Sequence, residues 1–158
     1  MILKHLTLLT MITLISACNV QNTKPESQSN LEDLIELRKN ADVAYESGNW
    51  GQAVEHYETL SQKITQDVDL WFRLGNAHAR LKHPGIALQA YQKALSLDSN
   101  NGKIWHNMGI VQLKLATNTF IEMQKHTTAD DPLNDRALQV VNAISKLLQQ
   151  DFGVEATK

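Results

Sequence analysis

Apolar residues recur every three or four positions through most of residues 31–150, a spacing that predicts amphipathic helices. Stretches rich in Gly, Pro, Asp and Asn interrupt this pattern at SGNW (47–50), KHPG (82–85), DSNN (98–101) and TTADDP (127–132). We expect turns or loops at these breaks. Asp131 followed by Pro132 is typical of a helix start, because the carboxylate can cap the helix and proline suits its first turn. The chain therefore predicts an all-α fold, in keeping with its 3 prolines and 7 glycines among 158 residues.

The pattern also repeats with a period of 34 residues. The recurring pairs are Trp71 and Trp105, Leu74 and Met108, Gly75 and Gly109, Ala53 and Ala87, and Tyr57 and Tyr91. A W-x2-L-G stretch followed by A-x3-Y at this period resembles the tetratricopeptide repeat family. The resemblance covers about residues 34–116, with repeat 2 complete, the second half of repeat 1 and the first half of repeat 3. It implies a solenoid of about two and a half helix-turn-helix repeats.

Small residues in this pattern are expected where two helices approach closely. The resemblance places Gly75 and Gly109 on the first helices of their repeats, and Ala53 and Ala87 on the second helices. We expect all four to be close-contact positions. Replacing such a glycine by a large side chain would force the helices apart.

Repeat 3 departs from the pattern after Gly109, because no A-x3-Y follows at the expected distance. Apolar residues run on to Met123 at helical spacing, so we expect a long helix there. The sequence leaves open whether this helix is continuous or kinked near Thr117–Thr119. Residues 133–150 predict a further helix, which would cap the open end of the stack.

The N-terminus predicts an export signal. An apolar run over residues 6–17 follows Lys4 and His5, and it is too short to cross a bilayer. Small residues precede Cys18, the sole cysteine, which resembles the lipobox of bacterial lipoproteins. That resemblance implies an acylated Cys18, and Asn19 after it favours the outer membrane. The alternative is an ordinary signal peptide with an unrelated cysteine.

The predicted domains follow from these features. They are a lipoprotein signal peptide (1–17), a lipidated cysteine with a disordered tether (18–30), a repeat domain with its capping helix (31–150) and a tail (151–158). The tether is predicted from its polar composition, which offers almost nothing to bury.

Charge and motifs argue against several functions. A net charge of −2 gives no reason to expect nucleic-acid binding. The glycines are scattered and form no phosphate-binding loop, and His78 and His83 are five residues apart, a poor spacing for two ligands on one helix. We therefore expect no enzyme activity, no metal and no cofactor.

The resemblance implies a concave groove lined by the first helix of each repeat. The candidate groove residues are Arg38, Asp42, Tyr45, Phe72, Arg73, Asn76, Arg80, Lys103, His106, Asn107 and Lys114. Asn76 and Asn107 resemble the asparagines with which some family members hold a peptide backbone. Arg38 and Lys103 fall where carboxylate-clamp members carry cations, but Asp42 and Arg73 replace clamp amides, so a complete clamp is not expected.

The groove carries an excess of positive charge. With Glu46 and Asp69 included, its inward residues hold five bases and three acids, which favours a partner of acidic character. The alternative is an ordinary solvated helical face.

The family resemblance and the export signal together suggest a function. We expect a lipid-anchored, periplasm-facing adaptor of the outer membrane that binds a protein or peptide in envelope, pilus or secretion assembly. One alternative is an accessory protein that recruits peptidoglycan enzymes. Another is a structural, self-associating subunit.

Overall fold

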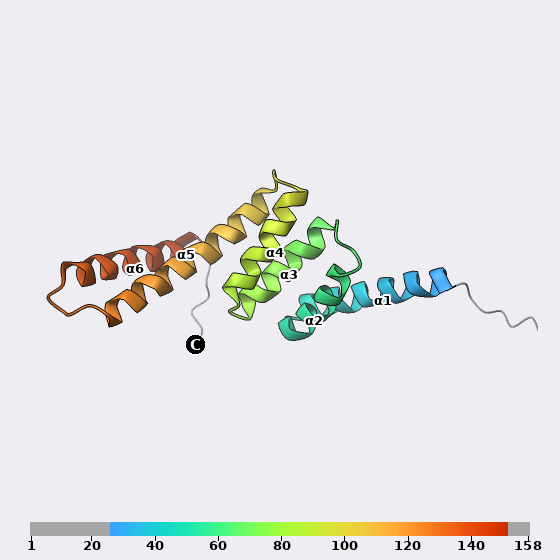
Figure 1. The fold of residues 1–158 in the computed structure, drawn as a ribbon, viewed down its shortest axis with the longest axis horizontal. Coiled ribbons are helices and arrows are strands. Elements are labelled where there is room, and N and C mark those ends of the chain that lie inside the picture. The colour runs from blue at the N-terminus through green and yellow to red at the C-terminus, as the bar shows by residue number, and fades with distance from the viewer. Residues whose placement is uncertain (1–25, 152–158) are drawn as a thin grey trace, which may run out of the picture.

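The computed structural model describes residues 26–151, which form helices joined by short loops and contain no strand within that range (Figure 1). The helices are α1 (Glu26–Glu46), α2 (Trp50–Ser61), α3 (Val68–Arg80), α4 (Pro84–Leu97), α5 (Gly102–Lys125) and α6 (Pro132–Asp151). The all-α prediction is confirmed, and each of the four predicted breaks lies between two helices or at a helix start.

Helices α1–α4 form two antiparallel pairs that stack side by side, and each helix packs against its neighbours in the chain. The turns within the two pairs share an unusual backbone conformation. Gly48 has φ +74° and Lys82, 34 residues later, has φ 60°. The left-handed region suits glycine and is uncommon for lysine, so the same turn geometry recurs although only the first turn has glycine at this position.

The core consists of two buried clusters. One lies among α1, α2 and α3 and is centred on Tyr57, Leu60 and Leu70. The other lies among α3, α4 and α5 and includes Tyr91 and Ile104. Trp71 packs against both clusters, so burial of apolar surface runs without interruption from α1 to α5.

The two repeat tryptophans make the same backbone hydrogen bond. The indole of Trp71 donates to the carbonyl of Thr65 (3.1 Å), and that of Trp105 donates to the carbonyl of Ser99 (2.9 Å). In each case the acceptor lies six residues earlier in the loop before the helix. The tryptophans therefore tie the loops between repeats to the helices that follow them.

The two repeat glycines differ in their surroundings. A Cβ atom on Gly75 would lie 2.6 Å from two ring carbons of Tyr91, so the predicted close contact is confirmed. A Cβ atom on Gly109 would meet nothing within 4 Å, so the same prediction for Gly109 is wrong. The reason is that, within residues 26–151, no second helix of repeat 3 lies against α5 at this point. Ala53 and Ala87 on the second helices are fully buried.

Helix α5 runs through 24 residues as one α-helix, which answers the question of its continuity. The hydroxyls of Thr117 and Thr119 donate to the carbonyls of Leu113 and Leu115, one turn earlier. These threonines therefore satisfy their polar groups on the helix itself and do not end it.

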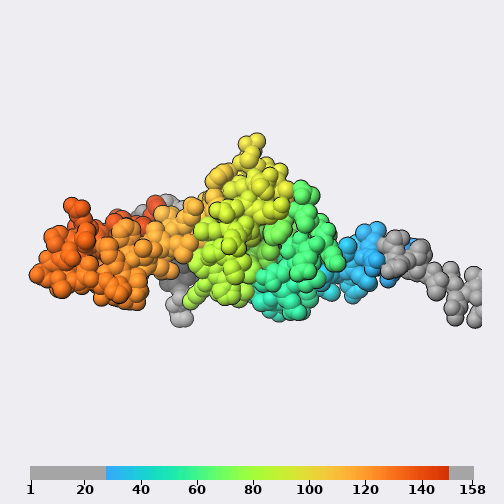
Figure 2. Space-filling model, viewed as in Figure 1, coloured from blue at the N-terminus to red at the C-terminus, as the bar shows by residue number. Residues whose placement is uncertain are grey.

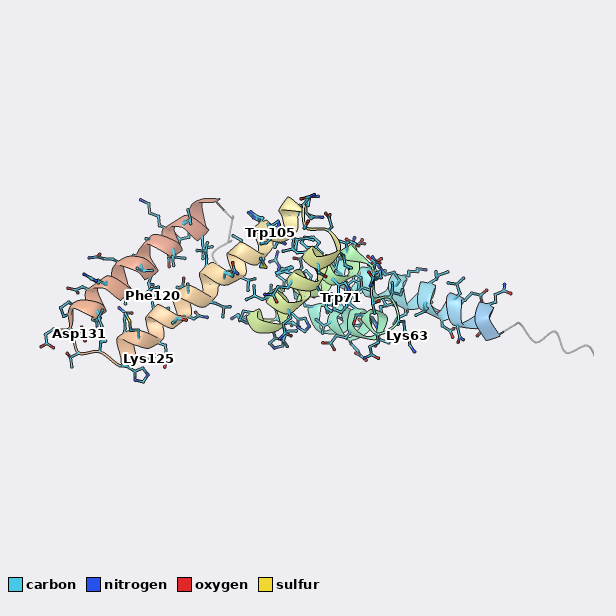
Figure 3. All side chains as sticks on the ribbon, turned by 45° about the horizontal axis from the view of Figure 1, so that its top comes forward. Lys63, Trp71, Trp105, Phe120, Lys125 and Asp131 are labelled. Atoms are coloured by element: carbon cyan, nitrogen blue, oxygen red, sulfur yellow. The ribbon has the colours of Figure 1, made fainter. Side chains whose placement is uncertain are left out.

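Helix α6 turns back and packs against α5, so the pair forms an elongated lobe beside the α1–α4 stack (Figure 2). Figure 3 shows Phe120 between the two helices. Asp131 accepts a hydrogen bond from the amide of Leu133 (2.8 Å), as expected of a residue that caps a helix start. Ala137 of α6 is fully buried.

Helix α1 begins earlier than the sequence pattern indicated. It starts at Glu26, whereas the prediction placed residues 18–30 in a disordered tether. The polar side chains of residues 28–30 are exposed, so burial does not explain this first turn. Its helical conformation is propagated from the packed part of α1, because extending a formed helix costs far less than starting one. The predicted signal peptide, Cys18 and residues 152–158 of the predicted tail lie outside the described residues.

Candidate functional site

Polar side chains of α1, α3 and α5 meet along one side of the stack. We call this set the polar row: Arg38, Asp42, Tyr45, Arg73, Asn76 and Asn107. All six are candidate groove residues, and all are half-buried. The structure therefore brings together the larger part of the predicted groove.

The ionic part of the row is held by shared carboxylates. The Arg38 guanidinium donates to Asp67 (2.6 Å) and Asp69 (2.8 Å), which links α1 to the start of α3. Its Nε also lies 3.3 Å from both carboxylate oxygens of Asp42. Arg73 donates to Asp69 (2.8 Å) and lies 3.8 Å from Asp42. Each arginine therefore bridges at least two carboxylates.

This pairing governs the protonation of the ionic groups. Partial burial by itself lowers the pKa of Arg38, but its contacts with Asp67, Asp42 and Asp69 raise that pKa above the ordinary value. Burial by itself raises the pKa of Asp67, whereas the amide of Leu70 and the Arg38 guanidinium lower it below the usual range. Both groups stay charged at neutral pH, as an ion pair requires.

The amide part of the row is centred on Asn76. Its amide nitrogen donates to the hydroxyl of Tyr45 (2.9 Å), and its oxygen accepts from Tyr91 (2.8 Å) and from the amide of Asn107 (2.7 Å). The Arg73 guanidinium lies over the Tyr45 ring, 5.2 Å from its centroid. One continuous set of contacts therefore joins the ionic and amide parts across three helices.

The repeat tyrosines support the row from the second helices. The Tyr57 hydroxyl donates to Asp42 (2.6 Å), and the Tyr91 hydroxyl makes the equivalent bond to Asn76. Burial, and for Tyr57 the nearby Asp42 carboxylate, raises the pKa of both phenols. They therefore remain protonated donors at any physiological pH, so they fix the orientation of Asp42 and Asn76.

The other predicted residues lie around the row or away from it. Phe72 and Lys103 line a pocket together with Asp69, where α3 and α5 meet. Arg80 lies over the ring of Trp50, 5.6 Å from its centroid. His106 lies on α5 beside Gly109, and Lys114 is exposed farther along that helix. The structure thus does not bring His106 and Lys114 into the row.

Three residues of this site were missed from the sequence. Asp67 caps α3 through the amide of Leu70 (3.0 Å) and also pairs with Arg38. Its place just before a helical pattern signalled a cap, but nothing in the sequence signalled a partner 29 residues away. The sequence pattern marks Tyr57 and Tyr91 only as recurring repeat positions, although a buried phenol usually needs a hydrogen-bond partner.

Asp67 also changes the charge of the site. Arg38 and Arg73 face the three carboxylates of Asp42, Asp67 and Asp69, which leaves this cluster at −1. The positive excess predicted from the sequence is therefore absent at the α1–α3 end. It is retained on α5, through Lys103 and Lys114.

Within residues 26–151, no group of three or more His, Cys, Asp or Glu side chains could hold a metal ion. His78 is buried, its Nε2 lies 3.4 Å from a carboxylate oxygen of Glu58, and its ring lies 5.9 Å from that of His83. In the same part of the chain, none of the helices combines the length and apolar character needed to cross a membrane.

Comparisons with known proteins agree with the fold. Residues 68–101, which form repeat 2, match the family described as tetratricopeptide repeat. Among curated proteins, none matches the chain. A solved structure described as PcrH in complex with the chaperone binding region of PopD has 22% sequence identity, covers 79% of this chain and 98% of its own, and gives a TM-score of 0.50. The chain therefore has a helical solenoid fold of the tetratricopeptide type.

Proposed function

We propose that this chain is a scaffold, not an enzyme, that binds a protein or peptide across α1, α3 and α5. The observation that carries the proposal is the line of hydrogen bonds from Tyr45 through Asn76 to Asn107. It holds polar side chains of three helices in one orientation, which lowers the entropy cost of binding a ligand across them. The similar PcrH structure, described as a complex with a binding region of PopD, supports a partner of this kind.

Amide groups suit a peptide ligand because they can donate and accept at once. Within the row, Asn76 and Asn107 each donate one hydrogen bond, and an amide nitrogen carries two hydrogens. The second hydrogen of each can meet a carbonyl of an extended or helical peptide. Acidic side chains of the partner would be met by Lys103 and Lys114 on α5, because the charges of Arg38 and Arg73 are already paired.

The test begins with capture of a partner from a detergent extract and continues with one variant and one control. Asn107→Ala removes an amide but keeps the hydrogen bond from the Tyr91 hydroxyl to Asn76, and affinity should fall by about 0.5–1.5 kcal/mol, or roughly tenfold at most. Gln92→Ala, an exposed amide on α4, should change nothing. Equal affinity of wild type and Asn107→Ala, with both folded by circular dichroism, would place the partner elsewhere.

We further propose that Cys18 is acylated and that the protein is anchored to the outer membrane, facing the periplasm. The support is the sequence ISAC after an apolar run, with Cys18 as the sole cysteine. Two or more acyl chains hold a protein stably on a membrane where one chain is marginal. Cys18→Ser should leave unprocessed or soluble protein. Mature Cys18→Ser protein that still fractionates with the outer membrane would contradict the proposal.

The identity of the captured partner decides the pathway. Pilus, secretion or other envelope-assembly components would support the assembly role that we propose. Cell-wall enzymes would instead support an accessory protein that recruits them to peptidoglycan. Capture of further copies of this chain, and of no other protein, would support a structural, self-associating subunit.

A further inference from the structure

Among the residues that the structure describes, no helix covers the face of α5 around Gly109, whereas α4 covers the same face of α3. In repeat 2, the ring of Tyr91 on α4 lies directly against Gly75, where a Cβ atom would be 2.6 Å from it. Gly109 stands 34 residues after Gly75, and a Cβ atom there would meet nothing within 4 Å. Repeat 3 therefore keeps the small residue that admits an aromatic ring, but the described chain places no ring there.

The open face is a hollow, which we call the Gly109 hollow. It is a shallow depression of about 470 Å³, largely open to solvent, and its lining residues are Trp105, His106, Gly109, Ile110, Gln112, Leu113 and Ala116. All of its lining residues belong to α5. Trp105 is 52% exposed, whereas its repeat equivalent Trp71 packs against both core clusters. An exposed tryptophan beside a glycine and aliphatic side chains is an apolar surface of the kind that binding partners cover.

The repeat pattern also indicates which aromatic ring would fit. In repeats 1 and 2, a tyrosine hydroxyl donates to the side chain of Asp42 or of Asn76. The position of this acceptor in repeat 3 is Ile110, and the position of the tyrosine is Lys125. A phenol placed over Gly109 would find no acceptor on Ile110, so its hydroxyl would lose hydrogen bonds to water without replacing them, which weakens binding. The hollow therefore favours phenylalanine over tyrosine.

The charge around the hollow adds a second requirement. Residues 102–120 contain Lys103 and Lys114 but no aspartate or glutamate. Both lysines are exposed. Lys103 lies beside Asp69 and Asp98 at the start of α5, whereas Lys114 lies farther along the helix. A ligand with acidic residues at the edge of its apolar face would therefore be attracted to α5 chiefly through Lys114.

We propose that the Gly109 hollow docks an amphipathic helix of the partner, in the position relative to α5 that α4 has relative to α3. The partner helix presents a phenylalanine over Gly109 and acidic residues at the edges of its apolar face. Small residues lie one turn to either side of the phenylalanine, as Ala87 and Ala94 flank Tyr91 in α4. This site continues the α3–α4 packing by one more helix. The inference rests on the proposed function, since it supposes that a protein partner exists.

The probe is a synthetic peptide with the sequence of α4, residues 84–97, that carries Tyr91→Phe and Lys93→Glu. It is titrated into the ¹⁵N-labelled chain, and amide shifts are followed by NMR. We expect shifts centred on residues 105–116. The peptide with Tyr91→Ala in place of Tyr91→Phe should bind at least about tenfold more weakly, since it lacks the ring. The peptide that keeps Tyr91 should bind more weakly than the phenylalanine peptide.

Two protein variants make the test specific. Gly109→Leu fills the hollow and should weaken binding at least about tenfold, while the open space at Gly109 lets the variant fold. Ile110→Asn restores the acceptor and should reverse the preference, so that the tyrosine peptide binds better than the phenylalanine peptide. Circular dichroism and thermal melting check that both variants are folded.

Three results would overturn the inference. The first is amide shifts centred on the polar row, and the second is equal binding of the peptide to wild type and Gly109→Leu. The third is the absence of shifts up to about 1 mM peptide, because this concentration should reveal even a weakly helical ligand. Shifts at residues 105–116 that depend on protein concentration without peptide would make a second copy the occupant and also overturn it. None of these results bears on the Asn107→Ala test, so a failure here is distinguishable from a failure of the proposed function.

Discussion

Two glycines with the same place in the repeat have opposite effects on packing. Gly75 lets the Tyr91 ring lie against α3, and so lets the Tyr91 hydroxyl reach Asn76 in the polar row. Gly109 faces open space. The absence of one Cβ atom therefore supports the site in repeat 2, whereas in repeat 3 it leaves the face of α5 open and gives the helix more backbone freedom.

Alanine at each glycine should consequently have opposite effects on stability. Gly75→Ala places Cβ 2.6 Å from ring carbons of Tyr91 and should destabilise the protein by about 1–3 kcal/mol. Gly109→Ala meets nothing and should stabilise it by about 0.5–1 kcal/mol, the usual gain from replacing glycine inside a helix. Urea unfolding of both variants measures this difference. Equal destabilisation by both would contradict the open face at Gly109.

His78 should make stability depend on pH. Burial lowers its pKa below the ordinary 6.5, and His83 acts in the same direction, although Glu58 opposes them. The folded state therefore favours neutral His78, and the unfolded chain takes up a proton first as the pH falls. The free energy of unfolding should decrease as the pH falls below about 6.5 and level off below the folded pKa.

Unfolding by urea at several pH values between 5 and 8 measures this effect. His78→Phe should lack most of the decrease, and His126→Gln, at an exposed position, should retain it. A wild-type curve that matches that of His78→Phe throughout this range would show that His78 is not the group responsible.

At the scale of whole elements, Asp67 joins two helices by two separate interactions. It caps α3 through the amide of Leu70 and pairs with Arg38 of α1. Asp67→Asn keeps a capping side chain but removes the ion pair, and should cost at most about 1 kcal/mol because the pair is partly exposed. Asp67→Ala removes both and should cost about 1 kcal/mol more.

Thermal melting at low and high salt separates the two interactions. The difference between wild type and Asp67→Asn should shrink in high salt, since screening weakens the pair, whereas the difference between Asp67→Asn and Asp67→Ala should persist. If salt changes neither difference, the ion pair does not contribute to stability.

The breaks between helices were predictable from the sequence because Gly48, Pro84 and Asp131 each carry a local turn or cap signal. The start of α1 and the continuity of α5 were not. Neither Glu26 nor Thr117 carries a signal that decides between helix and coil, since both depend on helix propagated from packed neighbours. The error at Gly109 has the same origin, because its surroundings depend on where the next helix goes.

Across the whole molecule, the repeat period predicted which side chains meet, but not how they pair. The 34-residue spacing placed Arg38, Asn76 and Asn107 on one side of the stack, as observed. The pairing of Arg38 with Asp67 and Asp69 depends on the offset between α1 and α3, which no local pattern encodes. Charges counted along a predicted face therefore overestimated its positive character.

Site-specific photo-crosslinking in cells tests most directly whether a partner binds across the first helices. A photoreactive amino acid replaces Glu46 or Lys103, exposed on α1 and α5 beside the polar row, and for comparison Gln52 or Gln92, exposed on α2 and α4. We predict adducts with one partner protein from Glu46 and Lys103 and none from Gln52 and Gln92. Adducts from Gln52 and Gln92 alone, or only adducts between two copies of this chain, would contradict the proposed binding face.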